Sequence, residues 1–200
     1  DLVEPFVGDG NLADIRLDTG DEITAHIANT GPMTGCAEPG WRVALSHHPN
    51  KGRKLPWSWE LVRPEPPWGS GDGWVLVNTA RANGVVGEAL RAGRIPAFER
   101  YRTVRPEVRW RPDRKSRLDF LLSDHADEPD APPWYVEVKN VTLRMDGDAL
   151  FPDTVTTRGA RHVADLTEIA RGGEARAAVM ENEDAGISTA VIRWAAGRLP

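Results

Sequence analysis

Cysteine is almost absent from this chain, which carries one, Cys36, among its 200 residues. A lone cysteine cannot close an internal disulfide, so the sequence excludes a disulfide-stapled secreted scaffold and suits a reducing cytoplasm. Long apolar runs are lacking too: none approaches the roughly 18 residues of a membrane-spanning helix, and the first residues do not form a signal peptide. We therefore predict a cytoplasmic protein without a membrane partner. The oligomeric state stays open.

An excess of positive charge is also missing. The chain has 25 Lys and Arg against 30 Asp and Glu, which gives a formal net charge of −5. This balance excludes binding to polyanions through overall charge, but it leaves room for a local basic stripe. The length is sufficient for one large domain or two small ones with a sizeable core.

The first third of the chain alternates short strand-like runs with turns rich in glycine. The β-branched and aromatic runs predict strands at residues 12–17, 22–27, 41–46, 57–62 and 74–77. About five short strands favour a small barrel of the OB type, a fold often used for oligonucleotides, although a barrel without a ligand is the alternative. Proline and glycine crowd residues 64–73, so we place a domain boundary there and divide the chain into domains 1–75 and 76–200.

One loop of this first domain is basic. It reads HHPNKGRK over residues 47–54, and it places Lys51, Arg53 and Lys54 just before Trp57. Cations beside an aromatic ring suit a nucleic-acid strand. An exposed, solvated loop is the alternative.

A helix is predicted over residues 78–92, with Gly93 at its C-terminal cap. Its apolar positions recur at helical spacing and predict one buried stripe. That stripe consists of Ala82, Val85, Val86, Ala89 and Leu90.

Arginine dominates the segment that follows, residues 91–117. Only Glu99, Glu107 and Asp113 oppose its basic side chains. Because the segment leads directly to Asp119, it is either an approach for phosphate groups or an ordinary solvated face. Glu107 is either a further site acid or an ion-pair partner for one of these arginines. The basic residues that we assign to DNA here are Arg109, Arg111, Arg114 and Lys115.

Two strands carry the most informative acids. Residues 134–143, WYVEVKNVTL, predict a strand in which Glu137 and Lys139, two apart, leave the same face. Residues 116–122 predict another strand, with Asp119 on the face opposite Leu118 and Phe120. A polar, proline-rich loop joins the two strands, so they can pair as neighbours. Asp followed by Glu-x-Lys on the adjacent strand resembles the PD-(D/E)xK nuclease core, whereas a plain surface strand is the alternative.

A second helix is predicted near residues 156–171. Val163, Leu166, Ile169 and Ala170 form its expected buried stripe. Arg158 and His162 lie four apart and share a face. Spacing alone indicates a surface pair. The alternative is that this face meets the carboxylate strands, where either side chain could contact a phosphate.

Several runs together resemble one family. They include NTGPMTG, GRKLPWSWELV, VNTARAN, SRLDFLL, YVEVKNVTL and FPDTVTTRGARHVADL, in that order. On these runs the chain is similar to the sugar fermentation stimulation protein (SfsA) family. The resemblance implies an α+β chain with an N-terminal OB-like β-barrel, followed by a PD-(D/E)xK nuclease-like α/β domain. It also implies sequence-nonspecific DNA binding in a prokaryotic cytoplasm.

The resemblance extends to single residues. It implies a triad of Asp119, Glu137 and Lys139, in which the two acids bind Mg²⁺ or Mn²⁺ and the lysine supports the attacking water. The family motif positions around that site correspond here to Arg117, Thr142, Phe151, Asp153, Arg158 and His162. The family's barrel motif corresponds to Asn29, Thr30 and Gly31.

The resemblance fades after Val179. Where the family continues with an apolar strand, this chain turns to Glu181, Asn182, Glu183 and Asp184. We therefore expect the last strand and helix of the fold to be missing or rewritten. Two functions remain as hypotheses: a DNA-binding protein with a metal-dependent endo- or exonuclease site, and a non-catalytic DNA-binding regulator of sugar (maltose) metabolism genes.

Overall fold

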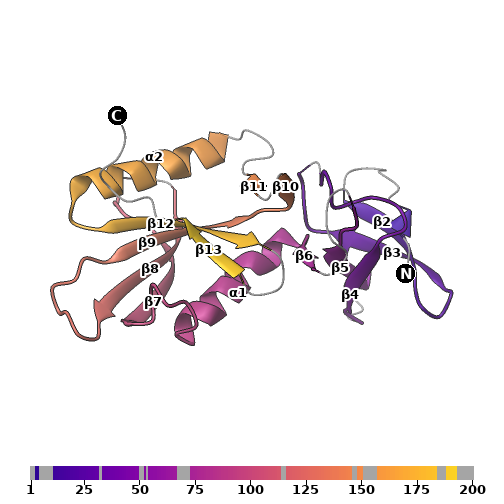
Figure 1. The fold of residues 1–200 in the computed structure, drawn as a ribbon, viewed down its shortest axis with the longest axis horizontal. Helices are drawn as coiled ribbons and strands as arrows, with labels where there is room; N and C mark the ends of the chain where they lie inside the picture. The colour runs from indigo at the N-terminus through magenta and orange to yellow at the C-terminus, as the bar shows by residue number, and fades with distance from the viewer. Residues whose placement is uncertain are drawn as a thin grey trace. The chain divides into compact units, whose positions relative to one another are not determined.

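The computed structural model describes residues 3–4, 11–31, 33–49, 52, 54–66, 73–113, 116–145, 148–150, 157–183 and 188–192. Strands and two helices make up these ranges, so the chain is α+β, as predicted (Figure 1). The chain divides into two compact units. The first consists of Asp1–Arg81, Asn140–Thr154 and Asn182–Ser188, and the second of Ala82–Lys139, Val155–Glu181 and Thr189–Pro200.

One six-stranded sheet forms most of the first unit, in the order β1-β2-β3-β5-β4 with β6 beside β5. Its neighbours pair antiparallel except β3 and β5, which run parallel, with Ala25 opposite Trp57. The five predicted strands are all present, and each of their ends lies within one residue of its predicted position. The strands are β1 (Val3–Glu4), β2 (Leu12–Arg16), β3 (Glu22–Ile27), β4 (Arg42–His47), β5 (Trp57–Arg63) and β6 (Val75–Leu76).

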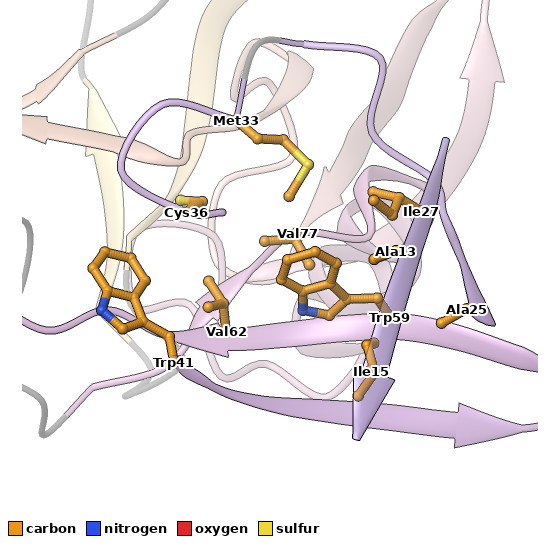
Figure 2. Packing of buried hydrophobic residues seen from close by; sticks show 10 residues of the cluster. All are labelled: Ala13, Ile15, Ala25, Ile27, Met33, Cys36, Trp41, Trp59, Val62 and Val77. Atoms are coloured by element: carbon orange, nitrogen blue, oxygen red, sulfur yellow. The ribbon is translucent and has the colours of Figure 1, made fainter. Parts of the chain in front are cut away.

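The core of this unit lies against the inner face of that sheet (Figure 2). Alternate residues of β2, Ala13 and Ile15, are buried, as the two-residue period of a half-buried strand requires. Trp59 is fully buried and its indole N–H donates to the carbonyl of Leu61 at 2.9 Å, so the largest side chain of the core leaves no polar atom unpaired.

The helix α1 (Thr79–Arg91) is anchored at its start by a polar cluster of the first unit. Asn78 caps it by accepting the N–H of Ala80, and the Asn78 amide also donates to Glu60 at 2.8 Å. Burial alone would raise the pKa of Glu60, but hydrogen bonds from Arg81, Ser46 and Asn78 lower it overall. The cluster therefore holds an ionised glutamate at the helix N-terminus.

At its C-terminus α1 ends at Arg91 and, as the sequence predicts, is capped at Gly93. Gly93 has a φ of 63°, which a glycine adopts without strain. Its N–H donates to the carbonyl of Leu90 at 3.1 Å, and the N–H of Arg94 donates to Ala89 at 2.9 Å. This pair of bonds is a Schellman cap.

The second unit is built on a five-stranded sheet in the order β13-β12-β9-β8-β7. In Figure 1, α2 lies along one side of this sheet and α1 along the other. Leu118 at the start of β8 packs with Leu166 and Ile169 of α2. The elements are β7 (Tyr101–Val108), β8 (Leu118–His125), β9 (Trp134–Asn140), α2 (Thr157–Gly172), β12 (Arg176–Glu183) and β13 (Ser188–Ile192). A separate hairpin pairs β10 (Leu143–Met145) with β11 (Asp148–Leu150).

Two valines contradict the predicted helix stripes. Val85 of α1 is 56% exposed and Val163 of α2 is 53% exposed. The buried positions of α2 include His162 and Asp165, and those of α1 include Gly87. Hydropathy periodicity misplaced both stripes because polar side chains in α2 and a glycine in α1 take inward positions.

One strand prediction was also wrong at its end. The strand predicted over residues 134–143 ends at Asn140, whose side-chain amide donates to the carbonyl of Leu76 in the first unit. The last strand was expected to be missing or rewritten after Val179. The described residues after Val179 form strands, because β12 continues to Glu183, with Met180 fully buried, and β13 extends the sheet.

Two glycines of α1 make a matched test of the packing that supports β8. A Cβ at Gly84 would meet nothing within 4 Å, whereas a Cβ at Gly87 would lie 3.0 Å from the Phe120 ring. Gly84→Ala is expected to raise the free energy of unfolding by about 0.5–1 kcal/mol, because alanine loses less entropy in a helix. Gly87→Ala is expected to have a lower free energy of unfolding than Gly84→Ala, since overpacking costs roughly 1–3 kcal/mol. Urea unfolding of the two variants measures the difference, and equal stabilisation would show that α1 does not press on Phe120.

Candidate active site

The pairing of β8 with β9 brings Asp119 and Glu137 to corresponding positions. Phe120 lies opposite Val136 in the antiparallel ladder, so the next positions along the two strands are Asp119 and Glu137. The neighbouring strands that the sequence predicts are therefore present. Asp119 contacts Asn83 of α1, whereas Glu137 contacts His162 of α2.

Two donors hold the Asp119 carboxylate. Its Oδ1 accepts the side-chain amide of Asn83 on α1 at 2.7 Å. Its Oδ2 accepts the backbone N–H of Val138 at 2.7 Å. Asp119 is thus fixed between the helix and the strand that carries Glu137. Each oxygen keeps a second lone pair, because a carboxylate oxygen has two.

Glu137 is the buried centre of the site, with 2% of its surface exposed. Its Oε1 contacts both the Lys139 ammonium and Nδ1 of His162. Its Oε2 is buried and has no hydrogen-bond partner among the described residues. Burial, and then the negative charge of Asp119, raises the pKa of Glu137, and the smaller effects of Lys139 and His162 do not offset this. The site therefore disfavours its own negative charge.

His162 corrects a prediction made from spacing. Spacing alone indicates a surface pair with Arg158, but His162 is only 4% exposed while Arg158 stays at the surface. Nδ1 of His162 lies within hydrogen-bond contact of Oε1 of Glu137. The side chain of Lys139 is 15% exposed, so it lies at the mouth of the site.

A pocket of about 290 Å³ adjoins His162. Glu107, Arg117 and Arg158 line it, as do Ser116 and Arg161. Glu107 sits in β7 with a φ of 53°, which is unusual for a residue other than glycine. The structure thus groups four of the predicted site residues around this pocket, which we call the arginine pocket.

The residues assigned to DNA are spread over both units. In the first unit Lys54 is exposed, and Trp57 packs against the barrel core with its ring centroid 4.4 Å from that of His47. In the second unit Arg109 is exposed, whereas Arg111 already pairs with Glu168 at 2.8 Å and stacks on Trp110.

Some predicted site residues are not part of this description. Lys51, Arg53, Arg114, Lys115, Phe151 and Asp153 lie outside the described residues. Thr142 belongs to the first unit, where its carbonyl accepts the Cys36 thiol at 3.1 Å. In that unit Oδ1 of Asn29 also accepts the N–H of Gly31 at 2.9 Å.

Sequence reasoning missed three contributors. Asn83 holds Asp119, Arg161 lines the arginine pocket, and buried Asp165 accepts the Ser116 hydroxyl. The signal for Asp165 was present, because an acid within a helix stripe next to Leu166 must find a partner. The signal for Asn83 was weaker, since a polar residue on a helix is ordinarily solvated.

Comparison with known proteins identifies the two units. Residues 12–77 match the model of the SfsA N-terminal OB domain, and residues 80–188 match that of the sugar fermentation stimulation protein RE domain. The fold is thus an OB domain followed by an RE domain. The chain belongs to the sugar fermentation stimulation protein (SfsA) family.

Relatives support this assignment. A sugar fermentation stimulation protein homolog of Alkalilimnicola ehrlichii is 52% identical over 171 residues, which cover 84% of this chain and 68% of the relative. A homolog of Hahella chejuensis is 46% identical over 177 residues, which cover 88% of this chain and 70% of the relative.

One solved structure has the same fold. It is SfsA of Pyrococcus furiosus in complex with Ca²⁺, with a TM-score of 0.69 at 22% identity over 90% of this chain and 70% of that one. Among the described residues, neither helix is both long and apolar enough to cross a membrane.

Proposed function

We propose that this protein binds DNA without sequence preference in the cytoplasm, and that its second unit carries a nuclease site dependent on Mg²⁺ or Mn²⁺. The observation that supports the proposal is the buried Oε2 of Glu137, which has no hydrogen-bond partner among the described residues and lies on the strand beside Asp119. A buried, unpaired carboxylate oxygen is costly unless a cation compensates it.

The donor set fits a hard divalent cation. Asp119 and Glu137 offer carboxylate oxygens, the ligands that Mg²⁺ prefers, and Mg²⁺ is usually held by one or two carboxylates together with water and substrate phosphate. Within the described ranges no three His, Cys, Asp or Glu side chains gather closely enough to hold a metal ion, so the protein would supply two ligands. The relative from Pyrococcus furiosus was solved with Ca²⁺, which also takes oxygen ligands.

When bound, such a cation lowers the pKa of a coordinated water and neutralises charge on a phosphate. The protein's own residues provide the rest. Asn83 and the Val138 amide fix Asp119, and His162 fixes Glu137. Lys139, whose side chain is partly exposed, would orient the attacking water beside the scissile phosphate.

DNA binding would depend on local arginines, because the net charge is −5. Arg105 and Arg109 are exposed and have no ion-pair partner within the described part of the chain. Affinity is expected to fall steeply with salt, since each neutralised phosphate releases counterions and adds about 0.9 to the slope of log K against log salt.

Changing Arg105 and Arg109 together to glutamine is expected to reduce that slope by roughly one to two, equally for unrelated DNA sequences. Arg100→Gln is the matched control, because Arg100 is already paired with Glu99 and Asp127 at 3.5 Å each. Fluorescence anisotropy at several salt concentrations measures the slopes. Affinity that does not change with salt would contradict phosphate contacts.

The alternative is a non-catalytic DNA-binding regulator of sugar metabolism genes. It is favoured by Oε1 of Glu137, which Lys139 and His162 already engage as in a structural ion pair. Calorimetric titration with Mg²⁺ and Mn²⁺ separates the two functions. A protein that binds neither cation is the regulator.

A further inference from the structure

The arginine pocket has the chemistry of a phosphate site. Three arginines line it, Arg117, Arg158 and Arg161, together with the Ser116 hydroxyl and His162. Its one acid is Glu107. Guanidinium groups present several N–H donors in a plane, which suits phosphate oxygens better than a lysine ammonium does. None of the three arginines forms an ion pair with a protein acid among the described residues.

The fold gathers these groups from two elements. Arg158, Arg161 and His162 share one face of α2, because positions three and four apart are neighbours on a helix. Arg158 lies in the first turn, where the helix dipole favours an anion. Arg117 comes from the segment before β8, and its neighbour Ser116 donates to buried Asp165 of α2. That bond holds Arg117 beside the helix.

The pocket adjoins the candidate active site through a single side chain. His162 lines the pocket and also contacts Glu137 through Nδ1. A phosphate in the pocket would therefore lie next to the carboxylates on the same nucleic-acid strand. This continuity indicates substrate positioning rather than an unrelated anion site.

We propose that the arginine pocket binds a terminal phosphate monoester of the DNA strand and so sets the position of that end relative to Asp119 and Glu137. The inference rests on the proposed function for its substrate. A monoester carries up to two negative charges and three free oxygens, whereas an internal diester carries one charge and two free oxygens. Three guanidiniums match the monoester better.

Binding without metal tests the proposal separately from cleavage. Short single-stranded oligonucleotides with a 5′-phosphate, a 3′-phosphate or hydroxyl ends are titrated by fluorescence anisotropy, in chelator and at low salt. The phosphorylated end that fits the pocket is expected to bind roughly ten times more tightly than hydroxyl ends, as a charge-assisted hydrogen bond implies. The two phosphorylated oligonucleotides show which end is recognised.

Changing Arg158 and Arg161 together to glutamine is expected to reduce that preference to about one. Arg171→Gln is the matched control, since Arg171 is exposed on the same helix and does not line the pocket. Glu107→Gln is expected to increase the preference, because it removes the acid of the pocket. Arg117→Gln gives an independent measurement from outside α2 if the double variant fails to fold.

The outcomes are distinct from those of the nuclease proposal. If the wild-type protein binds DNA without a preference for phosphorylated ends, the proposal that the arginine pocket binds a terminal phosphate is wrong, whether or not the protein binds metal. A preference that survives in the arginine variants overturns it as well. If the protein prefers phosphorylated ends but binds no metal, the phosphate-binding role of the arginine pocket is supported and only the nuclease site is contradicted.

Discussion

Glu137→Gln is expected to abolish binding of Mg²⁺ and Mn²⁺ and any metal-dependent cleavage of DNA. The substitution keeps the size of the side chain but removes the charge of a buried group whose Oε2 has no hydrogen-bond partner among the described residues. An amide oxygen is a weak ligand for a hard cation compared with a carboxylate. Affinity for DNA in chelator should persist or rise, since a negative charge facing phosphate has been removed.

Thermal unfolding provides the readout for binding. A cation at one hundred times its Kd stabilises the fold by about 2.7 kcal/mol, which raises Tm by roughly 5–10 °C in a protein of this size. The wild-type protein should show this shift and Glu137→Gln should not. Glu128→Gln is the control, because Glu128 is exposed in the loop between β8 and β9. A wild-type protein without any shift would make Glu137 and Lys139 a structural ion pair.

Asp119→Asn should also lose the metal, but with a second effect. Both oxygens of Asp119 accept hydrogen bonds, one from Asn83 and one from the Val138 N–H. An asparagine would turn its own amide donor toward one of these donors, and an unmet buried donor costs about 1–3 kcal/mol. Asp119→Asn is therefore expected to unfold at lower denaturant than Glu137→Gln. Equal stability of the two variants would argue against the bond from Val138.

Strand alternation was sufficient to predict that Glu137 and Lys139 lie together, as the contact between them shows. A period of two fixes which side chains of one strand share a face, so Glu137 and Lys139 could be grouped from the sequence. The loop between β8 and β9 then made the two strands neighbours, as their ladder shows. The five barrel strands were also predicted, because glycine turns separate their β-branched and aromatic runs.

Helix faces were harder to predict because hydropathy assumes that the buried face is apolar. Here α2 buries His162 and Asp165 and exposes Val163. Those polar residues have partners, Glu137 and Ser116, that are far away in sequence. Since no local pattern records such partners, the arginine pocket and the role of Asn83 emerge only from the tertiary structure. Hydropathy misplaced Val85 for the same reason, because α1 turns Gly87 rather than Val85 toward Phe120.

Lys139→Met separates metal binding from the chemical step. Methionine keeps an aliphatic side chain and removes the ammonium that contacts Oε1 of Glu137. Asp119 and Oε2 of Glu137 are untouched, so the Tm shift with Mn²⁺ should remain. Single-turnover cleavage at saturating protein should slow by roughly 10²–10³-fold, as for loss of one positioned polar group that stabilises a transition state.

The pH of that comparison matters. Lys139 lowers the pKa of Glu137, which burial and Asp119 raise. Removing the lysine raises that pKa further, so protons compete with the cation up to a higher pH. The comparison is therefore made over a pH series, and each protein is read on its own high-pH plateau.

Lys54→Met is the matched control for this test, because Lys54 is an exposed lysine of the first unit. It is expected to weaken DNA binding slightly and to leave the cleavage rate at saturating protein unchanged. If Lys139→Met instead loses the Tm shift together with cleavage, the lysine builds the site rather than acting on water. If cleavage continues at the wild-type rate, Lys139 serves only as the counter-ion that keeps Glu137 charged within the fold.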